Sequence, residues 1–188
     1  GDRQGVLRGD FGHSFFNQRP VLDVIAERAI PTLELSVASL ALSLILGITV
    51  GVIAAVTRGG WFDNISRIFA VLLNSIPGFW FGLMLLYYFA FEFNIFPLGN
   101  RCETTIAATC PPIYERWEYM VLPVIVLSAG GVANFSRYMR ASMLDIIGQD
   151  YIRTARSKGL SSSRIWYRHG MKNALIPIAT FIGPAIVG

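Results

Sequence analysis

Residues that commonly perform chemistry are few in this 188-residue chain. His13 stands alone, which disfavours a nickel ligand there, and a structural or interface hydrogen bond explains His169 better than a metal or pH role. Ser161, Ser162 and Ser163 form a hydroxyl cluster, but without a charge partner or a catalytic motif they are better explained as helix caps than as nucleophiles. The chain also lacks Gly-x-x-x-x-Gly-Lys-Ser/Thr, the phosphate-binding loop of many ATPases. We therefore expect it to bind no metal or cofactor and to hydrolyse nothing.

Long apolar segments define the fold class that must position any functional residue. Hydrophobic residues make up 53% of the chain and charged residues only 15%, against about 25% charge in soluble domains. Four windows contain no Asp, Glu, Lys or Arg and hold 81 of the 188 residues: 35–57, 68–91, 119–136 and 173–188. A helix needs about 20 apolar residues to cross a bilayer. The sequence predicts an all-α, polytopic helical membrane protein with about four spans, and it excludes a disordered chain, a disulfide-rich secreted module and an ordinary soluble enzyme domain.

The two ends of the chain suggest an internal piece of a longer membrane protein. It begins with Gly rather than Met, shows no signal peptide and stops inside an apolar run. We expect Pro31-Thr32 to start the first span, with Glu34 at the outer end of that span, exposed to water. Gly47 and Gly51, preceded by two serines at the same spacing, would let another helix approach closely, although chance in a Gly/Ala/Ser-rich helix explains the pattern equally well.

Basic residues concentrate in one segment and orient the spans. Eight of the sixteen Lys and Arg residues lie in 137–172 against two acids, whereas loop 92–118 has two basic residues and four acids. The positive-inside rule places 58–67 and 137–172 in the cytoplasm and, by alternation, 1–31 and 92–118 outside. The net charge of +4 is thus explained by topology and contact with anionic membrane lipid, and we expect no nucleic-acid partner.

Cys102 and Cys110 both fall in the loop that we place outside. An even pair on the oxidising side can form a disulfide, which is the favoured interpretation here. Two free thiols in a poorly ordered loop are the alternative. Metal binding is disfavoured because no His accompanies the cysteines.

Polar side chains interrupt the second and third spans. Pro77 should kink the second span, Asn74 and Ser75 precede it by one turn, and Asn134 lies near the end of the third span. Polar groups at this depth should face other helices or a pore rather than lipid. Hydrogen bonding between helices is the simpler interpretation, and a translocation path is the alternative.

The residue order within 137–172 predicts a helix, a glycine stop and a second helix. Gly159 fits the left-handed position after a helix end, and Ser161 or Ser162 can cap the next helix. Met139–Gln149 fits a continuous helix that leads from the third span into this elbow. We expect the elbow to expose apolar side chains among basic ones, as a knob for the groove of a partner. The expected knob residues are Ile152, Ala155, Leu160, Ile165 and Trp166.

The same segment resembles a known family. Gln-Asp-Tyr-Ile-Arg-Thr-Ala-Arg-Ser-Lys-Gly-Leu at 149–160, followed by Arg-His at 168–169 and Asn-Ala-Leu-Ile-Pro at 173–177, resembles the EAA loop of ABC importer permeases, specifically the oligopeptide/dipeptide/nickel branch. Further similar stretches, which extend the resemblance over nearly the whole chain, are 9–15, 19–21, 32–35, 77–82 and 137–143. Residues 153–155 are Arg-Thr-Ala where the general pattern has Glu-Ala-Ala, and 169–172 do not match its closing Ile-x-Leu-Pro; both departures are typical of the peptide-type branch.

The resemblance implies an ABC importer type-1 permease fold in a prokaryotic inner membrane. It implies an extracytoplasmic segment over 1–31, an incomplete transmembrane domain over 32–188 and a cytoplasmic coupling loop over 137–172. The implied partners are a second homologous permease, two cytoplasmic subunits that bind ATP–Mg, and an external substrate-binding protein. The elbow would dock in an ATPase cleft and transmit ATP-driven closure to the spans. The implied coupling residues are Asp150, Tyr151, Arg153, Thr154, Ala155, Arg156, Lys158, Gly159, Leu160, Arg164 and His169.

Two other function classes are weighed against this one. A secondary transporter or channel coupled to ions would need ionisable residues within its spans, and the four windows contain none. An intramembrane enzyme would need a paired Ser/Lys, two Asp or a His-rich site at membrane depth, which the windows also lack. The sequence leaves the substrate open among dipeptides, longer peptides, nickel, glutathione and sugars.

Overall fold

The computed structural model describes residues 10–16, 18–102, 110–161 and 165–187, with side chains except those of 167–169 and 181–187. The described part is helical, apart from turns and an isolated bridge between His13 and Pro20. Its elements are α1 (Val21–Val56), α2 (Trp61–Ser75), α3 (Gly78–Leu85), the π-helix η2 (Leu86–Glu92), the 3₁₀ turn η3 (Ile113–Glu115), α4 (Trp117–Ile147), α5 (Asp150–Ser157), the π-helix η4 (Ile165–Met171) and α7 (Lys172–Val187).

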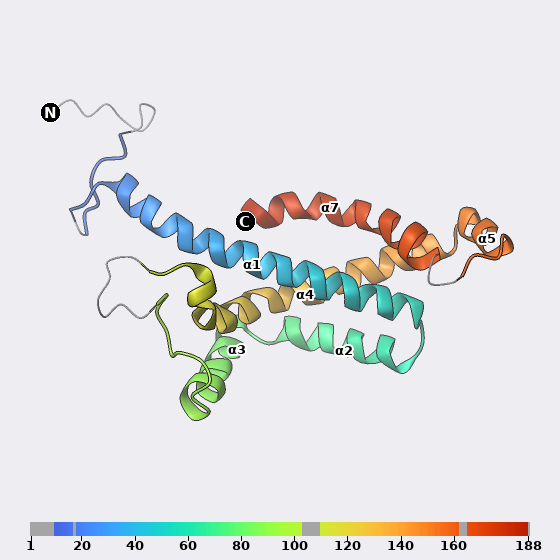
Figure 1. Cartoon of the computed structure of the whole chain (residues 1–188), viewed down its shortest axis with the longest axis horizontal. Coiled ribbons are helices and arrows are strands. Elements are labelled where there is room, and N and C mark those ends of the chain that lie inside the picture. Colours follow the sequence, from blue (N-terminus) through green and yellow to red (C-terminus); the bar gives the residue numbers. More distant parts are fainter. Residues whose placement is uncertain (1–9, 17, 103–109, 162–164, 188) are drawn as a thin grey trace.

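Helices α1 and α4 form the centre of the bundle. They run side by side in the same direction, with α2 against one side of the pair and α7 against the other (Figure 1). The main core joins the helices α1, α4 and α7, through Val52, Ala55, Phe135, Met139, Met143, Ala174 and Ile178. The α1–α2 turn and the elbow at α5 lie at one end of this bundle, and residues 10–16 and 18–20 lie at the other (Figure 1).

Small residues bring α1 and α4 close together. A Cβ added to Gly47 would lie 2.7 Å from Phe135 Cβ, and one added to Gly51 would lie 2.7 Å from both Met139 Cβ and the carbonyl oxygen of Ser136. One turn earlier, the hydroxyl of Ser43 donates to the carbonyl of Ser128 across the interface, at 3.1 Å. The small-residue pattern is therefore a helix contact rather than a coincidence of composition.

The helices do not begin where the apolar windows begin. Helix α1 starts at Val21, so Pro31 lies inside it and the expectation of a helix start at Pro31-Thr32 is wrong. Helix α4 continues from the third window to Ile147, so the continuous helix expected over Met139–Gln149 is present as far as Ile147 and ends there, before Gly148 and Gln149. Charged residues mark the edge of the apolar segment, but a helix can extend past that edge into water because its hydrogen bonds are internal.

The second expected span is broken rather than kinked. Helices α2 and α3 meet at an angle of 99°. Ile76 has extended dihedrals, φ −80° and ψ 125°, as expected for a residue before proline, where the α conformation is sterically disfavoured. In the described residues, α1 and α4 are long and apolar enough to cross a membrane, and α2 with α3 adds a third span if the bent pair is counted as one. Helix α7, the expected fourth span, has 16 residues.

Candidate functional site

The elbow between α4 and α7 turns at a glycine, as the sequence predicts. Gly159 has φ +74°, which an L-residue with a side chain rarely adopts. Its N–H donates to the carbonyl of Arg156 at 2.9 Å, and the N–H of Leu160 donates to the carbonyl of Ala155 at 3.3 Å. These two bonds form a Schellman motif that closes the C-terminus of α5. The sequence analysis expected Ser161 or Ser162 to cap the next helix, and of these two residues Ser162 lies outside the described residues.

The apolar side chains of the elbow are inside it, so the expectation of an exposed apolar knob is wrong. Ile152 and Ile165 are 0% and 1% exposed, and Ala155 is also buried. Leu160 and Trp166, both half-buried, pack against these three. The reason is geometric: the glycine turn folds η4 back over α5, and the apolar faces of the two short helices then cover each other.

The outer surface of the elbow is polar, and basic side chains outnumber acidic ones on it. The exposed coupling residues are Asp150, Tyr151, Arg153, Thr154, Arg156, Lys158 and Gly159. Arg153 pairs weakly with Asp150 at 3.6 Å, and the guanidinium of Arg156 lies 5.4 Å from the centre of the Trp166 ring. Two further expected coupling residues cannot be placed on this surface, since Arg164 and the side chain of His169 lie outside the described residues.

The elbow is packed continuously onto the bundle. Ile146 and Trp166 contact both the elbow cluster and the main core of α1, α4 and α7. The amide of Asn173, at the start of α7, donates to the hydroxyl of Tyr151 on α5 at 3.2 Å. A force on α5 would therefore reach α4 and α7 through close-packed side chains, which resist compression.

Two of the four residues considered for a translocation path lie together. The amide of Asn74 on α2 donates to Asn134 on α4 at 3.3 Å, and the same Asn134 oxygen accepts from Arg137 at 2.7 Å. Both asparagines remain exposed on the surface of the chain. Ser75 instead donates to the carbonyl of Val71 in its own helix, and Pro77 forms the α2–α3 break. Hydrogen bonding between helices is thus present, and the polar face is still open to a partner or to water.

An ion pair that the sequence analysis missed joins α2 to α4 at the elbow end. Asp63, which is 1% exposed, accepts from Arg140 Nε at 2.6 Å and from an Arg140 terminal nitrogen at 2.8 Å. The N–H of Gly59 in the α1–α2 turn donates to the same carboxylate at 2.9 Å. Asp63 lies before the charge-free window, and the Arg140 hydrogen bonds hold the pKa of its carboxyl at about 2. No local pattern signals this pair, because its members are 77 residues apart.

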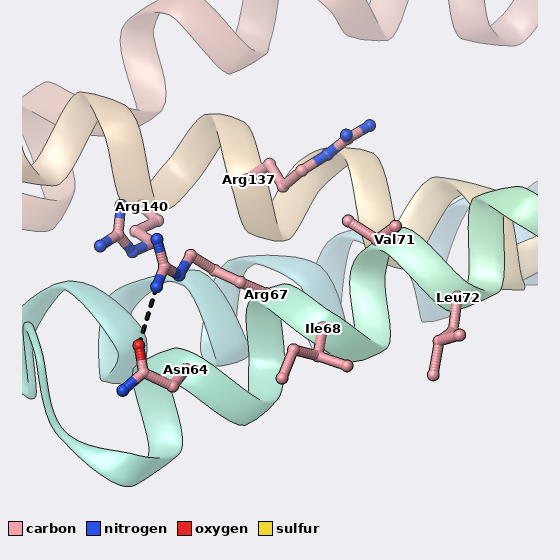
Figure 2. Close-up of a pocket in the computed structure, with 7 residues that line it drawn as sticks. All are labelled: Asn64, Arg67, Ile68, Val71, Leu72, Arg137 and Arg140. Carbon is pink, nitrogen blue, oxygen red and sulfur yellow. Dashed lines mark hydrogen bonds between the residues drawn. The ribbon is translucent and has the colours of Figure 1, made fainter.

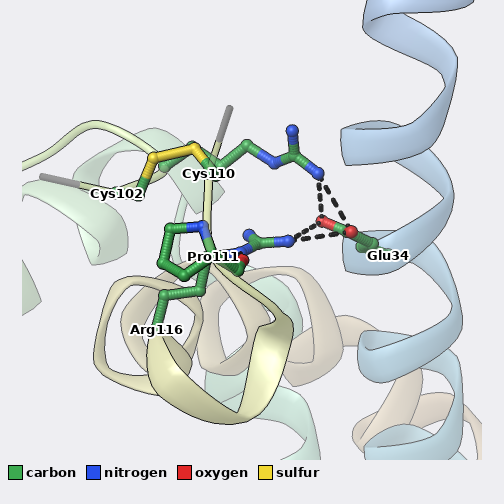
Figure 3. Close-up of a disulfide and its surroundings, with 6 residues drawn as sticks. Glu34, Cys102, Cys110, Pro111 and Arg116 are labelled. Atoms are coloured by element: carbon green, nitrogen blue, oxygen red, sulfur yellow. Dashed lines mark hydrogen bonds and ion pairs between the residues drawn. A yellow bond between two sulfur atoms is a disulfide. The ribbon is translucent and has the colours of Figure 1, made fainter. Parts of the chain in front are cut away.

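A second ion cluster, far from the elbow, joins Glu34 within α1 to Arg116 at the N-terminus of α4 and to the disulfide loop (Figure 3). Glu34 accepts from Arg101 at 2.9 Å and from Arg116 at 2.8 Å. Its side chain is only 16% exposed, so the expectation of a freely solvated carboxylate at this position is wrong. The buried Arg116 also donates from Nε to the carbonyl of Pro111 at 2.7 Å. Cys102 and Cys110, beside this cluster, are joined in a disulfide.

Comparison with known proteins identifies the family. Residues 47–188 match the family described as "Binding-protein-dependent transport system inner membrane component". The chain is 38% identical over 178 residues to the glutathione transport system permease protein GsiC of Escherichia coli K12 and to the proteins of the same name in Escherichia coli O1:K1 and Shigella dysenteriae serotype 1. Each match covers 95% of this chain and 54% of the relative, so the chain spans about half the length of the relatives it matches. The chain belongs to the inner-membrane permeases of binding-protein-dependent ABC importers, in their peptide and nickel branch.

Proposed function

We propose that this chain is a permease subunit of an ATP-driven importer of the peptide class. It forms part of a translocation path and is coupled to ATP-binding subunits through the elbow around Gly159. The observation that carries this proposal is the packing of the elbow: a turn fixed by the Schellman motif, with a buried interior that is continuous with the core of the bundle. Such a unit moves as one body with α4 and α7, as a mechanical coupling element must.

The buried interior changes how the elbow would be gripped. Ile152, Ala155 and Ile165 are buried inside the elbow and cannot contact a partner. The ATP-binding subunit would therefore contact the polar outer surface of the elbow, which includes Arg153 and Lys158. Charge complementarity would then orient the docking, while the buried core gives the elbow its stiffness. Closure of the ATP-bound subunits would displace α5, and α4 would carry that displacement into the membrane.

The remaining partners follow from the family. A second homologous permease would complete the path, two cytoplasmic subunits would bind ATP–Mg and perform the hydrolysis, and an external binding protein would deliver the substrate. This chain itself would be no enzyme. The protein would lie in a prokaryotic inner membrane, with 58–67 and 137–172 in the cytoplasm and 1–31 and 92–118 outside. The relatives named as glutathione permeases favour peptides or glutathione as the transported class.

Charge reversal at the elbow tests the proposal. The full-length protein carrying Arg153→Glu and Lys158→Glu is purified with its partners and placed in vesicles, and both the recovery of ATP-binding subunits and substrate-stimulated ATP hydrolysis are measured. We expect both to fall. Arg58→Glu is the matched control, because Arg58 is an exposed basic residue in the α1–α2 turn at the same end of the bundle.

Two outcomes would contradict the proposal. Undiminished recovery and hydrolysis in the elbow variant would show that the elbow is not the docking element. Uptake that needs an ion gradient and proceeds without ATP would instead support the secondary-transporter alternative.

A further inference from the structure

A cleft of about 750 Å³ lies between α2 and α4 at the elbow end of the bundle (Figure 2). One wall is apolar and is formed by Ile68, Val71 and Leu72 of α2, each more than half exposed in this chain. The other lining residues are polar or basic: Asn64, Arg67, Arg137 and Arg140. Among the described residues that line it, three are arginines and none is acidic.

Two of the three guanidinium charges have no carboxylate of their own. The charge of Arg140 is neutralised by Asp63 in a bidentate ion pair. Arg67 lies 3.9 Å from that already occupied carboxylate and donates to the neutral Asn64 at 2.8 Å. Arg137 donates to the neutral Asn134 at 2.7 Å. The cleft therefore holds about two uncompensated positive charges, and an anion that enters it gains a charge-assisted contact at each.

The two available arginines lie at successive depths. In Figure 2, Arg137 reaches along α4 over Val71, whereas Arg67 and Arg140 lie toward Asn64. Beyond Arg137, the bonded Asn74–Asn134 pair continues the polar face toward the α2–α3 break. Exposed amides at this depth are unfavourable against lipid tails, so this face is expected to meet water or protein. Polar side chains thus line the way from the α2–α3 break to the cytoplasmic end, and two of them, Arg137 and then Arg67, are cations at successive depths.

We propose that this cleft binds the terminal carboxylate of a peptide as it leaves toward the cytoplasm, with Arg137 and then Arg67 as its contacts. The inference rests on the proposed peptide-importer function. A free carboxylate is the anionic group that peptides of every sequence share, and planar guanidinium groups match it. The apolar wall of α2 suits the variable side chain beside that carboxylate. Because the two cations are separate steps rather than one chelating site, the anion can pass from one to the next.

Photo-crosslinking tests the proposal directly. The complete importer is placed in nanodiscs of phosphatidylcholine alone and exposed to Ala-photoleucine-Ala, either as the free acid or as the C-terminal amide. Mass spectrometry then measures labelling of residues 64–72. We expect the acid to label this segment about tenfold more than the amide, a ratio typical of a lost charge-assisted hydrogen bond. The double variant Arg67→Gln/Arg137→Gln should abolish that preference, and the exposed Arg58→Gln should preserve it.

Three results would overturn the proposal. Equal labelling by acid and amide would show that the carboxylate is not recognised. A photoactivatable phosphatidylglycerol that labels residues 64–72 and displaces the peptide would identify an anionic-lipid site. Separation of the two permeases in the Arg67→Gln/Arg137→Gln variant, seen by size-exclusion chromatography, would assign the arginines to subunit contact. Substrate-stimulated ATP hydrolysis in the same preparation reports on the proposed function separately, so failure of one idea is not mistaken for failure of the other.

Discussion

Removing either member of the Asp63–Arg140 pair should strongly destabilise the elbow end of the bundle. The carboxylate is 1% exposed and accepts three hydrogen bonds, two from Arg140 and one from the Gly59 N–H. Breaking a buried ion pair from one side typically costs about 3–5 kcal/mol, because the other charge is left uncompensated. Arg140→Ala should cost the most, since Arg140 is 21% exposed and can be partly hydrated once Asp63 is lost, whereas the Asp63 carboxylate cannot.

The double variant separates this explanation from simple loss of packing. Asp63→Ala/Arg140→Ala leaves no unpaired charge, so its cost should fall below the sum of the single variants by about 2–3 kcal/mol. The free energy of unfolding of the full-length protein can be measured in mixed micelles by titration with dodecyl sulfate, with helix content as the signal. Asp145→Ala, which removes an exposed acid near the end of α4, is the control and should change stability by less than about 0.5 kcal/mol. Additive single effects would refute the pairing argument.

The remaining predictions concern glycines and acid. Gly51→Ala should destabilise the α1–α4 contact by about 1–3 kcal/mol in the same titration, because the added Cβ would lie 2.7 Å from the Ser136 carbonyl oxygen. Gly78→Ala is the control and should not destabilise the protein, because the space around Gly78 is open. Equal effects of the two variants would exclude the close-contact explanation. Gly159→Ala should cost about 1 kcal/mol through its positive φ and should reduce substrate-stimulated ATP hydrolysis, and Gly148→Ala, at φ −79°, is the control that should do neither. The pKa of Asp63 is lowered from 3.8 to about 2, so the ionised carboxylate stabilises the folded state fully above pH 3.8. About 2 kcal/mol of folding free energy should be lost as the pH falls toward 2. Acid unfolding curves that have the same shape in the unmodified protein and in the Asp63→Ala variant would contradict this.

Which parts of the fold could be predicted depended on whether the signal was local. Three of the four apolar windows located helices that are long and apolar enough to cross a membrane, counting the bent α2–α3 pair as one, because apolar length is a property of each segment alone. Gly159 was predictable for a similar reason, since a left-handed turn imposes its own residue type. Helix starts were not predictable in this way, because α1 begins at Val21 with turns that contain charged residues and its apolar part begins only later. A kink at Pro77 was expected, whereas the structure has a 99° break there.

The features missed at the candidate site all depend on distant residues. Ile152 and Ala155, three apart on α5, form an apolar face that the sequence could not assign to the inside or the outside. Their burial became evident only once Ile165 was seen folded back over them. Glu34 and Arg116 lie 82 residues apart, and nothing near either residue distinguishes a paired charge from a solvated one. Charge counts give an expected sidedness for whole loops, but they do not say which charges within those loops are partners.

Helices α1 and α4 should move together when the elbow is displaced. The pair is joined away from the elbow by Glu34 and Arg116, and nearer to the elbow by the contact of Gly51 with the Met139 turn. At the elbow end of the bundle, α4 is further connected through Asp63 to the α1–α2 turn. Close-packed interfaces of this kind have discrete arrangements and do not deform continuously. We therefore expect a push on α5 to move the α1–α4 pair as one body.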